Sequence, residues 1–547
     1  MEKNRRLFLV LFLAVHCALA PTGLAQAQKS HEEKFGNVAG ITAGQLEDYL
    51  SFVASDEMQG RDTPSPGLRT TALFLAANLS RWGFKPAGDN NTFFQNIALR
   101  HARLDDRASC VVLGNRRYQY GDDFLAQYAA GAITGTMVYV KQCWTIPTSN
   151  IRPDDSIAVK DKIIITHAGY PAGVGFFELY GKKAGGDYHT AEHYAQRRGA
   201  QGLIFIPTFQ NLAVWPETRR KEVHEGAITV DKFEPAAGAS LPVITASPHL
   251  LAAIFKGELE SAAALFRRGI AEDEELIPSF ALNPDKKIGV TIAIKARIED
   301  TRNVVAVLEG GEGKLKSEYV ALGAHYDHVG IGAAVAGDSI YNGADDDGSG
   351  TVALLAMAEA FARGPRPKRS LLFVWHTGEE RGLWGSKYFS IYPLIPLDRI
   401  VTQLNLDMIG RSRKPGDTNP ANDQLSGPQE IYVIGSKMMS TQLGELSERV
   451  NQSYLKLAFN YKYDDPRDPN RFFFRSDHYH YARQGIPIIF YFDGVHEDYH
   501  RPSDQVEKID FQKMEKVTRT IFATAWELAN MPKRPAIDKK LPEALAE

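Results

Sequence analysis

The sequence predicts an α/β fold with a buried sheet, and two observations carry this prediction. Apolar runs at residues 317–322, 370–375 and 400–406 are each short enough to be a strand that is buried on both faces. Residues 351–358 are apolar almost all round, as expected of a helix that is covered on every side. In open α/β sheets, functional groups collect beyond the carboxyl ends of the strands, so the residues that follow these runs are the first candidates for a site.

The first residues of the chain have the pattern of a secretory signal. Basic side chains precede an apolar run over 7–20, and small-residue cleavage sites end at Ala20 and Ala27. The apolar run is shorter than the ~20 residues that a membrane-spanning helix needs. We therefore assign a signal peptide to residues 1–27 and expect an exported mature protein, periplasmic or secreted, with no membrane span after cleavage.

Two helices are expected next, at 42–54 and 66–82, because their apolar residues recur at helical spacing. We assign both of them a packing role. From about residue 131, short apolar runs alternate with one helical stretch, which predicts a separate small module. Its expected strands lie at 138–140, 162–166, 202–206 and 241–245, and its expected helix lies at 188–198.

Histidines and cysteines in this middle region leave alternatives open. His189 and His193 are four residues apart on the expected helix, which is a spacing that metal ligands use, but surface histidines are favoured because Thr rather than Glu follows His189. Cys110 and Cys143 are the cysteines outside the signal. They either form a disulfide, as an oxidising compartment allows, or are two buried thiols.

The rest of the chain adds a buried strand at 303–308, an amphipathic helix at 511–530 and a loose tail at 532–547. A length of 547 residues, of which 44% are hydrophobic, is enough for more than one core. The net charge of -3 and the scattered Lys and Arg residues give no sign of nucleic-acid binding.

Histidine and carboxylate side chains gather after the predicted strands. The set is His325, Asp346, Glu380, Asp407 and His500. Zinc accepts both kinds of ligand, and a pair of zinc ions ~3.5–4 Å apart can share one carboxylate and one water. Two histidines and three carboxylates supply one of each per ion and leave one carboxylate as a bridge. The set therefore predicts a site for two zinc ions.

Five motifs surround these residues. In chain order they are His325-x-Asp327, Asp345-Asp346-x-x-Ser349-Gly350, Gly378-Glu379-Glu380-x-Gly382-Leu383-x-Gly385-Ser386, Asn405-x-Asp407-Met408-Ile409-Gly410 and Asp498-Tyr499-His500-x-Pro502-x-Asp504. Over about 301–510 the chain resembles the co-catalytic dizinc exopeptidase family, which includes secreted bacterial leucyl-type aminopeptidases and the glutamate carboxypeptidase II group. Residues 131–245 resemble the protease-associated domain that many members contain, and residues 50–83 resemble their N-terminal cap segment.

The resemblance implies a role for each residue of the site. One zinc would be bound by His325 and Asp407, and the other by Glu380 and His500. Asp346 would bridge the two ions, with a cis peptide bond to the following residue.

Further roles follow from the same resemblance. Glu379 would be the general base, and Tyr499 would donate a hydrogen bond to the oxyanion. Asp327 would orient His325 without itself binding the metal. We interpret Asp477 and His478, which match another family motif, as structural residues or as supports of the ligands. The remaining histidines nearby are expected to be satisfied core or rim residues, and they are His328, His376, His480 and His496.

The fold implied by the resemblance is a twisted mixed sheet flanked by helices on both faces, with an inserted small α/β or β-rich domain. The expected divisions are a signal peptide at 1–27, an N-terminal part of the peptidase domain at 28–130, the protease-associated insert at 131–250, the catalytic domain at 251–531 and the tail at 532–547.

The implied function is that of an exported zinc aminopeptidase that acts on peptides. Three alternatives stay open. The first is a carboxypeptidase or dipeptidase on the same scaffold, and the second is a glutaminyl cyclase, which resembles this family but uses one zinc. The third is a non-catalytic binding ectodomain, against which the complete ligand set and Glu379 argue.

Overall fold

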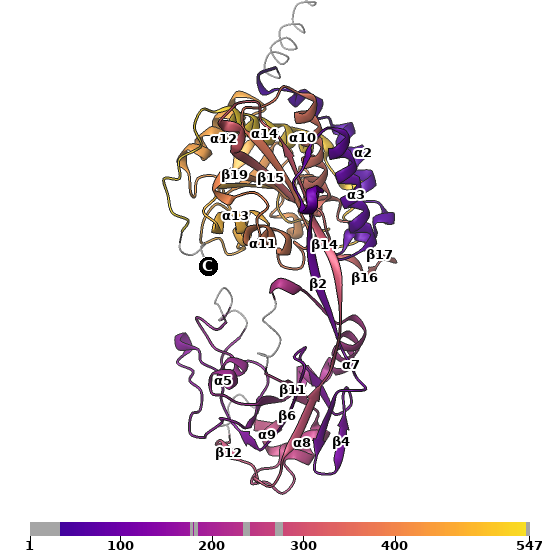
Figure 1. Cartoon of the computed structure of the whole chain (residues 1–547), viewed down its shortest axis with the longest axis vertical. Coiled ribbons are helices and arrows are strands. Elements are labelled where there is room, and N and C mark those ends of the chain that lie inside the picture. The colour runs from indigo at the N-terminus through magenta and orange to yellow at the C-terminus, as the bar shows by residue number, and fades with distance from the viewer. Residues whose placement is uncertain (1–32, 176–178, 180–183, 234–240, 269–276, 543–547) are drawn as a thin grey trace, which may run out of the picture. The chain divides into compact units, whose positions relative to one another are not determined.

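The computed structural model describes residues 33–542 except 176–178, 180–183, 234–240 and 269–276. The predicted signal peptide lies outside the described residues. These residues form two compact units, of which the first consists of residues up to Ile97 and from Asp300 onwards, and the second of Ala98–Glu299. The strands β2 and β14 run through the boundaries between the units (Figure 1). Among the described residues, no helix is both long and apolar enough to cross a bilayer.

A mixed sheet forms the centre of the first unit. Its strand order is β10-β2-β14-β18-β15-β19-β22-β20-β21, in which β10 (Ala227–Val230) pairs with the part of β2 that belongs to the second unit. The four strands β18, β15, β19 and β22 are parallel neighbours, whereas β14 joins β18 and β20 joins β22 in the antiparallel direction. The bounds are β1 Lys85–Pro86, β2 Phe94–Leu104, β14 Ile294–Leu308, β15 Tyr319–His325, β16 Gly330–Val335, β17 Asp338–Tyr341, β18 Ser370–His376, β19 Ile400–Leu406, β20 Glu430–Ile434, β21 Ala458–Asn460 and β22 Ile488–Phe492.

Helices cover both faces of this sheet. The helices α2, α3, α10, α12 and α14 pack on one face, and α11 and α13 pack on the other (Figure 1). Strand β14 shows why two cores form, because Val304 and Ala306 point into the first and Val305 and Val307 into the second. The bounds are α2 Ala43–Val53, α3 Pro66–Arg81, α10 Gly350–Arg363, α11 Trp384–Ile391, α12 Thr441–Ser453, α13 His478–Arg483 and α14 Phe511–Asn530. The predicted α/β class, with a mixed sheet between helices, is confirmed.

Helix α10 is the buried helix that the sequence predicts at 351–358. Every residue from Gly350 to Phe361 is buried, and Leu354 and Leu355 are fully covered. Each such leucine contributes about 1.5–3 kcal/mol through the area it removes from water. The helix begins directly after the turn that carries Asp346, so its packing fixes that turn against the sheet.

The second unit contains two further sheets. The six-stranded sheet has the order β12-β7-β8-β9-β11-β5, and the four-stranded sheet has the order β4-β3-β13-β6. Its strands are β3 Cys110–Leu113, β4 Arg116–Gln119, β5 Phe124–Ala126, β6 Gly131–Gly135, β7 Met137–Tyr139, β8 Ile163–His167, β9 Gly202–Ile206, β10 Ala227–Val230, β11 Val243–Ala246, β12 Phe280–Ala281 and β13 Ile288–Ile292. Its helices are α5 Ala191–Arg197, α6 Phe209–Ala213, α7 Trp215–Arg220, α8 Pro248–Ile254 and α9 Ala262–Arg268.

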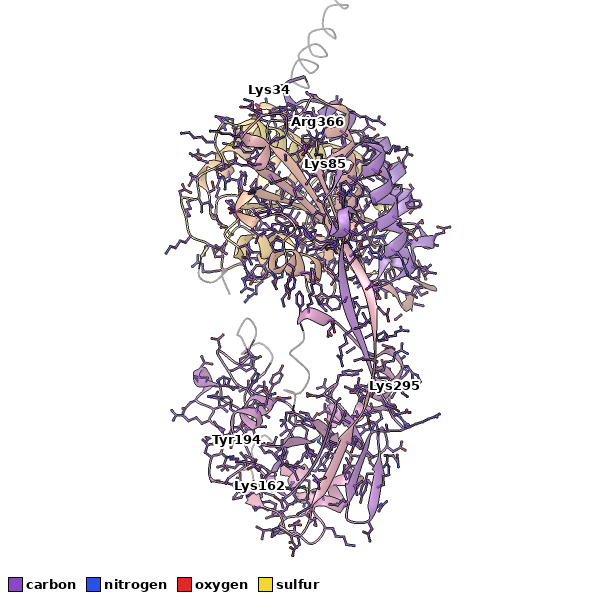
Figure 2. The ribbon with its side chains drawn as sticks, viewed as in Figure 1. Lys34, Lys85, Lys162, Tyr194, Lys295 and Arg366 are labelled. Carbon is purple, nitrogen blue, oxygen red and sulfur yellow. The ribbon has the colours of Figure 1, made fainter. Side chains whose placement is uncertain are left out.

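This unit is longer than the insert expected at 131–250. Strand β13 pairs with β3 and β6, and β5 pairs with β11, so segments on either side of the expected insert contribute strands to its sheets. Lys295 on β14, which is labelled in Figure 2, also lies in this unit, and its Nζ is 3.1 Å from Oδ2 of Asp105. The assignment of the unit to the protease-associated type stays a prediction.

Local contacts show the state of the cysteines and the role of His193 in the second unit. Cys110 and Cys143 are both buried and free, so they are thiols and not a disulfide. His193 takes part in capping α5, because its Nδ1 lies 2.9 Å from the hydroxyl of Thr190. Tyr194 on the same helix, which is labelled in Figure 2, donates a hydrogen bond of 3.2 Å to Asp155.

Candidate metal centre

The parallel part of the first sheet brings the predicted site residues to one edge. His325 ends β15, Glu379 and Glu380 follow β18, and Asp407 follows β19. The chain beyond β22 turns back to place His500, while Asp346 comes from the turn before α10. Because neighbouring parallel strands end together, groups that are far apart in sequence meet at this edge.

Each of the five predicted ligands contacts at least one other member of the set. Nε2 of His325 lies 3.6 Å from Oδ1 of Asp407 and 3.3 Å from Oδ1 of Asp346. Nε2 of His500 lies 3.0 Å from Oε2 of Glu380 and 3.0 Å from Oδ2 of Asp346. The two oxygens of Asp346 thus face two different pairs, each made of one histidine and one carboxylate. This arrangement matches the predicted division into two half-sites with Asp346 between them.

Asp346 and Asp347 have different environments although they are adjacent. The peptide bond between them is cis, as the resemblance implies. The carboxylate of Asp347 accepts hydrogen bonds from the backbone N–H groups of His325, Gly350 and Met408, at 3.1, 2.9 and 3.1 Å. Asp347 therefore ties three segments together, whereas the oxygens of Asp346 face the two histidines.

Burial and charge act together on these groups. Asp346 is 3% exposed and Asp407 is 5% exposed. Burial raises the pKa of Glu379 well above its usual range, and the carboxylates of Glu380 and Asp407 add to this effect. Burial would also raise the pKa of Asp346, but hydrogen bonding to His325 and His500 holds that pKa well below its usual range. Buried carboxylates at this spacing need positive charge beside them, and the nitrogen and oxygen donors match the ligands that zinc prefers.

The tautomer of His325 also agrees with zinc binding at this site. Its Nδ1 lies 3.1 Å from the backbone carbonyl of Asp327, which can only accept, so Nδ1 carries the proton. Nε2, which faces Asp346 and Asp407, is then the nitrogen that a metal ion would use. Asp327 therefore contacts His325, as expected, through its backbone carbonyl, while its nearest carboxylate oxygen is 3.8 Å from Nδ1.

The carboxylate of Asp327 serves the next loop instead. It accepts a hydrogen bond from the backbone N–H of Glu379 at 3.2 Å and one from the hydroxyl of Thr63 at 3.1 Å. Glu379 lies beside the half-site of His325, with Oε2 4.0 Å from Nε2. Glu379 and Tyr499 line the same pocket as Asp346 and Asp407.

Several histidines have contacts that the sequence does not reveal. His328, expected to be a core or rim residue, is fully buried, and its Nδ1 lies 2.8 Å from Oε1 of Glu380. It therefore contacts a predicted ligand. The sequence signal for this contact is the position of His328 just after His325, at the end of β15. His376 contacts the hydroxyl of Tyr481 at 3.2 Å. Asp477 is fully buried, and the ring of His478 stacks on that of Phe490.

Arg61 contacts the segments that form the site, although the sequence predicts no role for it. It is 0% exposed, although arginine is almost never fully buried unless it is paired. Its guanidinium donates to the carbonyls of Tyr326, Asn342 and Gly343 at 3.0, 2.7 and 2.8 Å, and also to Val53 at 2.8 Å. Two of these carbonyls precede the Asp346 turn and one follows His325. Arg61 thus holds together the two segments that supply Asp346 and His325.

Replacing Arg61 with methionine should weaken zinc binding about 10–100-fold, the effect typical of a group that supports a ligand. The variant keeps the aliphatic stem but leaves the carbonyls of Tyr326, Asn342 and Gly343 without their donor. Zinc affinity is measured by titrating the metal-free protein against a competing chelator, with circular dichroism as the test of folding. Arg69→Met, an exposed arginine on α3, is the matched control. An Arg61→Met protein that is folded and binds zinc like the wild type would contradict the positioning role.

Comparisons with known proteins give the family of this region. The family description Peptidase family M28 matches residues 303–525. Leucine aminopeptidase 2 of Trichophyton rubrum is 26% identical over 284 residues, which are 46% of this chain and 51% of that protein. A probable zinc metalloprotease of Pyrenophora tritici-repentis is 27% identical over 263 residues, which are 43% of this chain and 52% of that protein. The chain thus spans about half the length of these curated relatives.

Solved structures of similar arrangement include two bacterial aminopeptidases. The aminopeptidase from Aneurinibacillus sp. strain AM-1 is 16% identical, with a TM-score of 0.48 and coverage of 92% of this chain and 97% of that chain. The zinc aminopeptidase BSAP from Bacillus subtilis is 16% identical, with a TM-score of 0.45 and coverage of 91% and 99%. The matched segment 303–525 contains all five predicted ligands together with Glu379 and Tyr499. Residues 303–525 therefore match peptidase family M28, and the motifs of this segment resemble those of the co-catalytic zinc exopeptidases.

Proposed function

We propose that the protein is an exported zinc-dependent exopeptidase that removes amino-terminal residues from peptides. The observation that carries this proposal is the position of Asp346 between two pairs of residues, His325 with Asp407 and His500 with Glu380. A site with two such pairs and one shared carboxylate is suited to two metal ions. The names of the relatives, leucine aminopeptidase and zinc metalloprotease, agree with this reading.

Zinc ions bound by these five residues would polarise the substrate carbonyl and lower the pKa of a water molecule, so that the water can attack at neutral pH. The residues of the chain would bind and orient these ions. His325, Asp407, Glu380 and His500 would hold the ions in place, and Asp346 would set the spacing between them. His328 would keep Glu380 oriented through the contact at Nδ1.

Glu379 is the proposed general base. Its backbone N–H is fixed by Asp327, and its carboxylate faces the pocket that Asp346 and Asp407 also line. From this position it would accept a proton from the attacking water and return it to the departing amine. Glu379 precedes the ligand Glu380, and successive side chains just past a strand can point in different directions.

Tyr499 is the proposed donor to the oxyanion. Its hydroxyl oxygen accepts a hydrogen bond of 3.3 Å from Arg475, so its own proton is left for another partner. Tyr499 lines the same pocket as Glu379, and the substrate carbonyl would bind in this pocket. A hydrogen bond that forms only as negative charge develops would lower the barrier.

Peptides with a free amino terminus should be cleaved at least tenfold faster than the same peptides with an acetylated amino terminus. The physical reason is that acetylation removes the positive charge of the terminal ammonium, which Glu379, the carboxylate of this pocket that is not a proposed metal ligand, would attract. The measurement is release of the first residue from leucyl peptides, free and acetylated, followed by chromatography. Equal rates for both forms would reject amino-terminal action and favour the carboxypeptidase alternative.

A further inference from the structure

The pocket at the proposed metal site has an acidic side, an aromatic side and one cation. The acidic side consists of Asp346, Glu379 and Asp407, and the aromatic side includes Phe472 and Phe490. Arg475 is the single cationic side chain among the residues that line this pocket in the described structure. Zinc ions would neutralise the acidic side, so Arg475 would be the cation left to meet the substrate.

Arg475 is held in place by contacts with uncharged side chains. Its NH2 donates to the hydroxyl of Tyr499, and its guanidinium carbon lies 4.9 Å from the centre of the Phe472 ring. In the part of the chain that the structure describes, no ion pair joins Arg475 to an acidic side chain. The side chain is exposed to solvent. A planar guanidinium that stacks on an aromatic ring keeps its other N–H groups free for a carboxylate.

We propose that Arg475 binds the free α-carboxylate of the residue that follows the scissile bond, so that dipeptides are the preferred substrates. This inference rests on the proposed function. In a dipeptide, only the amide nitrogen and the α-carbon separate that carboxylate from the scissile carbon. A cation that contacts Tyr499, the proposed oxyanion donor, therefore lies within reach of it. In a longer peptide an uncharged amide takes the place of the carboxylate.

The test compares three substrates that differ only at their ends: leucyl-alanine, leucyl-alanine amide and N-acetyl-leucyl-alanine. With the wild-type protein, kcat/KM for leucyl-alanine should exceed that for the amide at least tenfold, mainly through a lower KM. Arg475→Met should reduce this ratio to about one, and Arg475→Lys should restore part of it because the charge returns without the planar fork. A wild-type ratio near one, or an unchanged ratio in Arg475→Met, would overturn the proposal.

The matched control is Arg483→Met. Arg483 is an exposed arginine over the ring of Tyr479 in the same unit, and it does not line the pocket. This variant should keep the wild-type ratio. Zinc content is measured for every variant and should stay the same, which separates loss of carboxylate binding from loss of the metal site.

The acetylated substrate separates this proposal from the proposed function. Cleavage of N-acetyl-leucyl-alanine at the rate of leucyl-alanine would reject amino-terminal action, while the ratio between acid and amide would still report on Arg475. Cleavage of both free substrates at equal rates would instead reject the role of Arg475 and leave the aminopeptidase proposal intact.

Discussion

Replacing Glu379 with glutamine should lower kcat by at least ~10²-fold while zinc binding is retained, because general acid–base catalysis typically contributes about 10²–10⁴-fold. Glutamine keeps the size of the side chain and its hydrogen-bonding capacity, but it cannot accept the proton from the attacking water. The backbone N–H of residue 379 would still donate to Asp327, so the loop should keep its shape. The measurement combines steady-state kinetics on an unblocked leucyl peptide with metal analysis of the same sample.

The adjacent carboxylate provides the matched control. Glu380→Gln removes a charge one residue away, from the group that contacts both His328 and His500. We expect this variant to lose zinc affinity first and activity as a consequence. If Glu379→Gln kept near-normal kcat with unchanged zinc content, Glu379 would have no part in proton transfer and the proposed mechanism would lack its base.

Replacing Asp346 with alanine should weaken zinc binding more than any other single change in the site. Both of its oxygens face histidines of different pairs, at 3.3 and 3.0 Å, so the change removes one ligand from each half-site. Loss of a group that only supports a ligand typically costs 10–100-fold in metal affinity. We expect at least the upper end of this range, about 100-fold, for Asp346→Ala. Zinc titration of the metal-free protein against a competing chelator measures the effect.

Asp338→Ala is the control for this change. Asp338 is an exposed carboxylate in β17, on the segment that leads to the Asp346 turn. Its loss should leave zinc affinity at the wild-type value, because this carboxylate is exposed and accepts its hydrogen bond from the backbone N–H of Ile340. Two zinc ions bound by Asp346→Ala with wild-type affinity would mean that another carboxylate bridges them.

The sequence alone predicts the strands that build the site and the residues that meet there. His325, Glu380 and Asp407 each follow an apolar run, and such runs become parallel neighbours in an α/β sheet, so the three side chains had to meet at one edge. His500 and Asp346 come from turns, where periodicity carries no information. Their place in the site was implied by the motifs that they share with a known family.

Other features depend on contacts between distant segments and leave no local pattern. Arg61 is more than 260 residues away from Tyr326 in the chain, and a lone arginine in a loop is normally a solvated residue. The oxygen that contacts His325 is the backbone carbonyl of Asp327, which no side-chain pattern encodes. The bounds of the second unit depend on the pairing of β13 with β3, two strands that are widely separated in the chain.

Zinc content per chain is the most direct test of a shared two-metal site. The full-length protein is equilibrated with zinc, dialysed against buffer without chelator and analysed by mass spectrometry of its metal content. We predict two zinc ions per chain, because Asp346 lies between two complete pairs of ligands. One ion per chain would contradict the bridging role of Asp346 and favour chemistry of the glutaminyl cyclase type, and no ion would favour a non-catalytic binding protein.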